Sequence, residues 1–147
     1  MRTMRVGLLA VICVSSVAAP APAEDSLLKV EVFSTAEFEW SNQRAAASCC
    51  DIRMHFFDEL ESFTQTLSGQ LSANPAIAER EAMALFEANH SQLESIAQRQ
   101  ADTLRQAMAY KIERYPAVVF EHGEAVVYGV TDIGKAILIY KEWEARR

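Results

Sequence analysis

The stretch Tyr115–Gly129 constrains the fold of this chain more than any other segment. Two short runs of apolar, mostly β-branched residues flank a turn at 121–124, where Gly123 can adopt a positive φ without a steric cost. This pattern predicts an antiparallel β-hairpin. Pro116 begins the first strand, one of the few places where a strand accepts a residue without an N–H, and the Tyr115-Pro116 bond is a candidate for the cis form.

Two further strands and several helices are expected around this hairpin. The segment 26–33 is largely apolar, and apolar and polar residues alternate from Asp51 to Phe57, as in a half-buried strand. The segment 43–48 is compatible with a linker or with a short helix, and Thr131 or Asp132 caps a final helix. The order strand, strand, helices, hairpin, helix predicts an α/β fold with a parallel and an antiparallel pair in one sheet.

Capping residues divide the helical region. Asp58 opens an acidic capping pattern, and Asn74-Pro75 opens a second helix because proline costs nothing in the first turn. Ser91–Glu94 is another capping box, inside a long run without glycine or proline. We therefore expect either two helices here or one helix kinked at Asn89.

The helical segment 91–113 carries an apolar stripe at three- and four-residue spacing. Its members are Leu93, Ile96, Ala97, Ala101, Leu104, Ala107, Met108 and Ile112. Such a stripe is typical of a helix that packs on a sheet, and an interaction helix shows the same stripe to its partner. Both interpretations stay open.

The hairpin and its surroundings resemble known proteins at two levels. A strand pair opened by proline and followed by a closing helix is similar to the second half of the thioredoxin-like fold. Tyr115–Phe120 and Ala125–Asp132, with Val30–Phe33, resemble a family of small exported proteins encoded in integrating conjugative elements, among type IV secretion and mating-pair-formation genes. The resemblance implies a thioredoxin-like α/β sandwich: a four-stranded mixed sheet with helices on both faces and an extra helix before the cis-proline strand.

The first 23 residues have the features of a signal peptide. Arg2 and Arg5 precede the apolar core Val6–Val17, and Ala21–Ala23 supplies small residues before a cleavage point. The core is shorter than the roughly 20 residues that cross a bilayer. We expect residues 24–147 to form one periplasmic, thioredoxin-like domain without stable membrane insertion, with a retained N-terminal anchor as the alternative.

The charge of the chain argues against nucleic acid as a partner. Without Arg2 and Arg5, 12 basic residues stand against 20 acidic ones, a net charge of −8. Phosphate backbones and anionic lipid repel such a domain. We therefore expect protein partners, which the resemblance places in the mating-pair-formation apparatus.

The segment after the first strand lacks the thiol pair of active thioredoxin-like enzymes. In those enzymes a Cys-x-x-Cys motif begins the first helix, whose N-terminus stabilises a thiolate. Glu37 and Trp40 stand nearest to the two cysteine positions and cannot carry out thiol exchange. This absence favours a protein that is not an enzyme.

Cys49 and Cys50 are the cysteines that remain after removal of the signal peptide. Adjacent cysteines form a disulfide only through a strained ring, and strained disulfides are labile. Three alternatives stay open: thiols that pack at the start of a strand, a vicinal or intermolecular disulfide, and catalysis. Catalysis needs an electropositive neighbour, which this stretch lacks.

No metal or cofactor is expected. His55, His90 and His122 each lack a second His, Cys or acidic residue at the spacing of metal ligands. The sequence also shows no nucleophile–base pair and no glycine-rich phosphate loop. The sequence therefore gives no support for an enzyme that depends on a metal ion, a nucleophile–base pair or a phosphate-binding loop.

Two hypotheses for the function follow. The first is a non-enzymatic periplasmic component or assembly factor of a conjugative type IV secretion system. The resemblance then implies a peptide-binding groove, because a peptide pairs with the residue before the cis-proline in active relatives of the fold. Its residues would be Thr35, Ala36, Glu37, Phe38, Tyr115 and Pro116. The second hypothesis is a periplasmic thiol-disulfide oxidoreductase or isomerase that uses Cys49-Cys50.

Overall fold

The computed structural model describes residues 27–147, so the predicted signal peptide lies outside the described residues. The elements are β1 (Leu28–Ser34), α1 (Gln43–Ala46), β2 (Cys50–Phe56), α2 (Glu59–Ser68), α3 (Pro75–Ala109), β3 (Ala117–Phe120), β4 (Ala125–Tyr128) and α4 (Ile133–Glu144). This order agrees with the prediction, and the segment 43–48 forms the short helix α1. Within these residues, no helix is long and apolar enough to cross a membrane.

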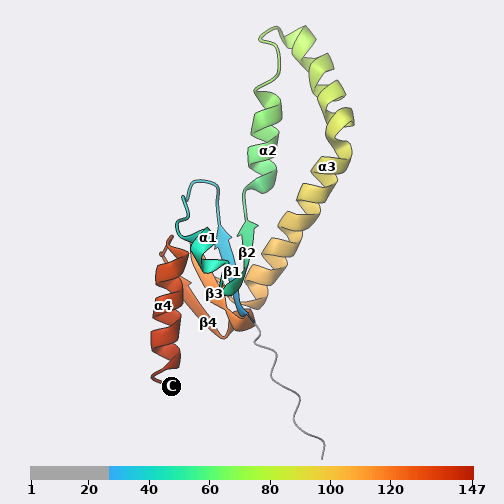
Figure 1. Cartoon of the computed structure of the whole chain (residues 1–147). Coiled ribbons are helices and arrows are strands. Elements are labelled where there is room, and N and C mark those ends of the chain that lie inside the picture. The colour runs from blue at the N-terminus through green and yellow to red at the C-terminus, as the bar shows by residue number, and fades with distance from the viewer. Residues whose placement is uncertain (1–26) are drawn as a thin grey trace, which may run out of the picture.

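The four strands form one open, mixed sheet in the order β2-β1-β3-β4 (Figure 1). β1 runs parallel to β2, with Leu28 opposite Cys50, and antiparallel to β3. β3 and β4 form the predicted hairpin, with Val118 opposite Val127. The α/β class and the combination of parallel and antiparallel pairs are therefore confirmed.

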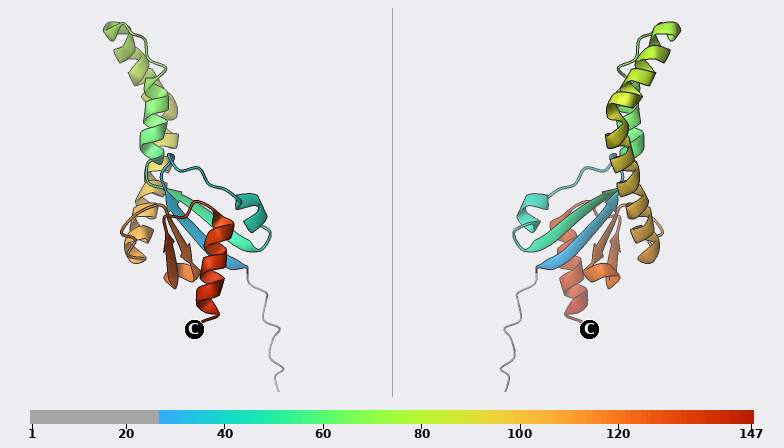
Figure 2. Two further views of the ribbon diagram at one scale, coloured as in Figure 1. Left: turned by 90° about the vertical axis from the view of Figure 1, so that its left-hand side faces the viewer. Right: turned by 90° about the vertical axis from the view of Figure 1, so that its right-hand side faces the viewer.

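Helices cover both faces of this sheet. Val30 and Val32 face α1 and α4, whereas Phe33 and Val119 pack with Ala107 of α3 on the opposite face. Figure 2 shows α4 in front of the sheet from one side and α3 in front from the other. Because side chains alternate along β1, this strand contributes residues to the apolar layers on both faces of the sheet.

α2 and the first part of α3 leave the sheet and form a helical hairpin, residues 59–95, which we call the arm. The arm projects away from the sheet in every view (Figures 1 and 2). At 1.5 Å per residue, the 35 residues of α3 span about 52 Å. α2 contains no buried residue, and the first buried residue of α3 is Ile96. Only the second half of α3 is therefore anchored in the core.

α3 is one continuous helix, which excludes the first of the two expected alternatives, a pair of separate helices. The capping residue Asn74 behaves as predicted, because its side chain accepts a hydrogen bond from the Ala76 N–H (3.1 Å). Asn89 lies inside the helix, and its side chain donates to the Leu85 carbonyl (2.8 Å). Without glycine or proline to stop it, the helix passes through Ser91–Glu94 and bends gently along its length (Figure 1).

Candidate functional site

The Tyr115-Pro116 peptide bond is cis. Pro116 is buried directly before β3, and its carbonyl accepts a hydrogen bond from the Gly129 N–H (2.9 Å). Tyr115 is 50% exposed. Among the described residues, neither its main-chain N–H nor its C=O is bonded to another main-chain group. The main-chain hydrogen bonds around β3 thus leave Tyr115 out.

The loop Thr35–Phe38 reaches Tyr115 through the ring of Phe38. The Phe38 ring meets the Tyr115 ring edge-on, with centroids 6.3 Å apart. The Phe38 N–H donates to the Thr35 carbonyl (3.3 Å), which closes the loop into a turn. The six residues expected to form a groove thus come from two segments that meet at this contact.

Asp58 holds this loop in place, and this differs from its expected role. It occupies the N-cap position of α2, but its side chain makes no capping bond to the helix. Its carboxylate instead accepts a hydrogen bond from the Ala36 N–H (2.9 Å). Glu37 accepts one from the Thr35 hydroxyl (3.1 Å). The Ala36 N–H thus fixes the loop to Asp58, the residue before α2, whereas the bond between Thr35 and Glu37 lies within the loop.

On its other side, Tyr115 lines an open apolar hollow of about 370 Å³, which we call the Tyr115 groove. Its lining residues are Phe57, Leu104, Ala107, Met108, Ile112, Glu113, Arg114 and Tyr115. The rings of Phe57 and Tyr115 lie 5.6 Å apart. Leu104 and Met108 are exposed, whereas Ala107 is buried. The apolar stripe of α3 is thus partly core and partly the wall of this groove.

A buried carboxylate, which the sequence did not reveal, lies on the same face of the sheet. Glu31 is only 5% exposed. The Tyr110 hydroxyl and the Gln106 amide each donate to it at 2.7 Å. His55 Nε2 lies 3.1 Å and His122 Nδ1 lies 3.7 Å from its oxygens. One carboxylate therefore joins β1, β2, the end of α3 and the β3–β4 turn.

This cluster connects to the groove through stacked rings. Phe33 stacks on His55 with centroids 4.6 Å apart and lies 6.1 Å from Phe57, which reaches Tyr115. Burial and the hydrogen bond to Glu31 raise the pKa of Tyr110. In the described part of the chain, no three His, Cys, Asp or Glu residues are placed to hold a metal ion. The geometry is that of a buried polar link between elements.

The two cysteines lie at the opposite end of the sheet from Tyr115. Cys50 begins β2 and Phe57 follows its last residue, a separation of roughly 20 Å along the strand. The two Sγ atoms are 3.2 Å apart, and both are free thiols. Burial, and then the hydrogen bond with Cys49, raises the pKa of Cys50 to about 12. A thiol with this pKa holds almost no thiolate at neutral pH, which makes it a poor nucleophile.

Comparison with known proteins gives one match. No curated protein and no solved structure shows significant similarity to the chain. A protein-family model described as "Protein of unknown function (DUF1525)" matches residues 28–146, which include every helix and strand described above. Because this match spans far more than half of its length, the chain belongs to the DUF1525 family.

Proposed function

We propose that the protein is a non-enzymatic periplasmic component or assembly factor of the conjugative type IV secretion system of an integrating conjugative element. It would act by binding other proteins of the mating-pair-formation apparatus. The resemblance of Tyr115–Phe120 and Ala125–Asp132 to exported proteins of such elements supports the setting. The signal-peptide features of residues 1–23 support export.

We also infer that the domain is thioredoxin-like. The strand order β2-β1-β3-β4, with one parallel and two antiparallel pairs, supports this assignment. So do the proline directly before β3 and the closing helix α4. In this interpretation, the arm is the extra helical element inserted before the proline-opened strand.

The observation that carries the proposed binding function is the environment of Tyr115. Among the described residues its main-chain N–H and C=O are not bonded to another main-chain group, and an apolar groove of about 370 Å³ lies beside it. An extended peptide gains affinity from main-chain hydrogen bonds and specificity from side-chain pockets. Tyr115 would supply the main-chain hydrogen bonds, and Leu104 and Met108 would line a pocket for a side chain of the peptide. Neither contribution needs thiol chemistry.

The test is the transfer of the element from a donor strain that lacks the gene. The strain is complemented with the wild-type gene, with Tyr115→Ala, or with the double variant Cys49→Ser/Cys50→Ser. Leu138→Ala is the matched control, because it removes an exposed side chain of α4 outside the groove. At equal protein levels, we expect Tyr115→Ala to lower transfer at least about tenfold, the cost of losing a central aromatic contact. The control and the double cysteine variant should restore transfer fully.

The other outcomes separate the competing hypotheses. Failure of the double cysteine variant alone would favour a thiol-disulfide oxidoreductase that uses Cys49 and Cys50. Full restoration by Tyr115→Ala would refute the Tyr115 groove as the binding site. Unchanged transfer in the deletion strain would refute the conjugative setting.

A further inference from the structure

The arm carries a second apolar surface, remote from Tyr115. Leu67, Leu71, Leu85, Phe86 and Leu93 line an open hollow of about 170 Å³ between its two helical segments, and we call it the arm groove. A dry cavity of about 150 Å³ is large enough for benzene. The arm groove therefore has room for one aromatic or leucine side chain.

Two helices alone leave this surface uncovered. α2 and residues 75–95 of α3 contain no fully buried side chain. Phe86 is 57% exposed although it lines the groove, and Ile77 and Met83 are also exposed. Helices in water owe most of their stability to the burial of an apolar face. A third helix laid over the arm groove would bury Phe86.

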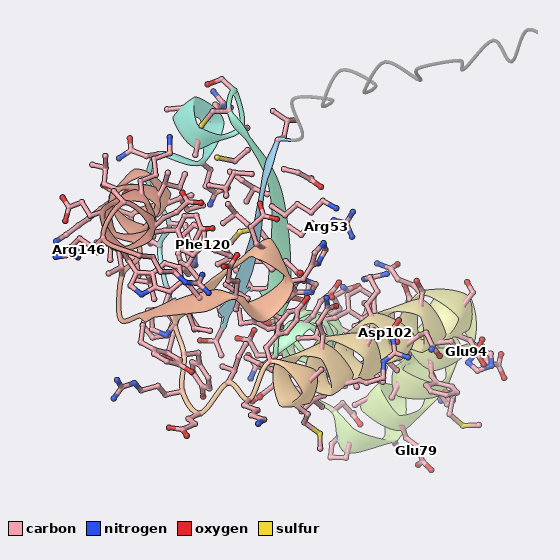
Figure 3. The ribbon with its side chains drawn as sticks, turned by 90° about the horizontal axis from the view of Figure 1, so that it is seen from below. Arg53, Glu79, Glu94, Asp102, Phe120 and Arg146 are labelled. Carbon is pink, nitrogen blue, oxygen red and sulfur yellow. The ribbon has the colours of Figure 1, made fainter. Side chains whose placement is uncertain are left out.

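The charge of the arm distinguishes among possible occupants. Across residues 59–95 it carries six acidic side chains and one basic side chain, Arg80, a net charge of −5 with His neutral. The acidic residues are Glu59, Glu61, Glu79, Glu81, Glu87 and Glu94. Figure 3 shows Glu79 and Glu94 pointing away from the ribbon of the arm. A second copy of the arm and an anionic lipid surface would both be repelled, whereas a cationic surface would be attracted.

We propose that the arm groove binds a cationic amphipathic helix of a partner protein. An aromatic or leucine side chain on the apolar face of that helix would enter the groove beside Phe86. Glu87 and Glu94 are seven residues apart and so share one face of α3, and each follows a groove-lining residue, Phe86 or Leu93, in the sequence. They would pair with Lys or Arg on the flank of the incoming helix. The proposal does not depend on the Tyr115 groove.

A synthetic peptide of leucine and lysine, with leucines at helical spacing, is the probe. Its fluorescein-labelled form is titrated with the purified protein, and binding is followed by fluorescence anisotropy. The control peptides are a scrambled sequence of the same composition and a leucine–glutamate peptide with the same spacing. The control variants are Leu138→Ala and Glu142→Gln on α4, both at exposed positions.

We expect the leucine–lysine peptide to bind the wild-type protein and the control variants equally. Phe86→Ala should weaken binding about tenfold, as truncation of a central aromatic contact does. The double variant Glu87→Gln/Glu94→Gln should weaken binding and reduce its dependence on salt concentration. Neither control peptide should bind.

Other outcomes would overturn the proposal. Equal affinity for wild type and Phe86→Ala, or equal binding of the scrambled or acidic peptide, would exclude the arm groove as the site. A dimer that Phe86→Ala dissociates in sedimentation would make a second copy the occupant. If the wild-type protein co-sediments with phosphatidylglycerol vesicles and Phe86→Ala does not, the occupant of the groove is lipid. Tyr115→Ala should bind the peptide like wild type, so failure of the proposed function is distinguishable from failure of this inference.

Discussion

Glu31 joins four segments of the chain through one buried carboxylate. Tyr110 and Gln106 donate hydrogen bonds to it from the end of α3. His55 reaches it from β2, and His122 from the β3–β4 turn. Hydrogen bonds to an ionised acceptor are stronger than those between neutral groups, and a buried donor left unpaired is costly. This single side chain therefore contributes much to the attachment of α3 to the sheet.

Glu31→Ala should lower the free energy of unfolding by about 2–4 kcal/mol, because it leaves the Tyr110 hydroxyl and the Gln106 amide without their acceptor. Urea denaturation measures the change. Glu142→Ala, at an exposed position on α4, should stay within about 0.5 kcal/mol of wild type. A loss at position 31 no larger than this control would show that the carboxylate does not hold α3.

The thiols of Cys49 and Cys50 should differ in reactivity. Cys49 is exposed, whereas the pKa of Cys50 is raised to about 12, chiefly by burial. Because the thiolate is the species that reacts, iodoacetamide at pH 8 should modify Cys49 alone. Cys50 should react only after unfolding or as the pH approaches its pKa. Mass spectrometry of the labelled peptides distinguishes the sites, and rapid labelling of native Cys50 would contradict the assignment.

The pKa of Cys50 differs between the folded and unfolded states, and this difference makes the stability of the protein depend on pH. The unfolded thiol ionises near its ordinary pKa of 9.0 and the folded one near 12, so the folded state binds the extra proton between these values. The stabilising contribution of Cys50 is therefore complete below about pH 9 and declines as the pH rises toward 12. The difference in unfolding free energy between wild type and Cys50→Ala should shrink over this interval. A constant difference would show that the thiol titrates normally.

At the scale of elements, the β3–β4 turn depends on one glycine. Gly123 has a φ of 101°, and a Cβ there would lie 2.9 Å from a ring carbon of Tyr110. Gly123→Ala should thus cost about 1–3 kcal/mol through backbone strain and displacement of the ring. Gly69→Ala is the matched control, because its φ is −65° and its nearest neighbours are 3.6 Å away. Equal thermal stability of the two variants would contradict this account.

Local patterns predicted most elements because their causes lie within a few residues. The hairpin, the caps Asn74 and Asp132 and the final helix follow from propensity, turn chemistry and periodicity. The bond between Asp58 and Ala36 was missed because a carboxylate before a helix is expected to cap it, whereas here its partner is 22 residues away. The sequence could not choose between two helices and one at α3, because the capping box at Ser91–Glu94 fits a helix interior equally well.

Of the six residues expected to form a groove, Tyr115 alone lines the Tyr115 groove, whose other walls depend on contacts distant in sequence. The facing of Phe38 and Tyr115 was anticipated only through resemblance to a fold. Glu31, His55 and His122 looked unrelated because spacing along the chain does not report which strands become neighbours. Because side chains alternate along β1, Glu31 points to the other face of the sheet from Val30 and Val32. A charged residue within an apolar strand is the signal that could have indicated a buried hydrogen-bond partner.

At the scale of the whole molecule, the arm and the sheet should differ in stability. Among residues 27–147, the buried apolar residues belong to the sheet, to Pro116 directly before β3, to α1, to α4 or to the part of α3 from Ile96 onward. Amide hydrogens of residues 59–95 should therefore exchange faster than those of β1 and β3, whose residues are almost all buried. Hydrogen exchange followed by mass spectrometry measures this contrast. Equal protection of both parts would mean that the protein opens as one unit.

The uninterrupted course of α3 has a mechanical consequence. The same helix carries Phe86 in the arm and Leu104 in the wall of the Tyr115 groove, about 27 Å apart along its axis. A continuous helix is stiff, and this one is anchored in the core from Ile96 onward. Any tilt of α3 would therefore move the tip of the arm and the Leu104 wall of the Tyr115 groove together, because one helix carries both.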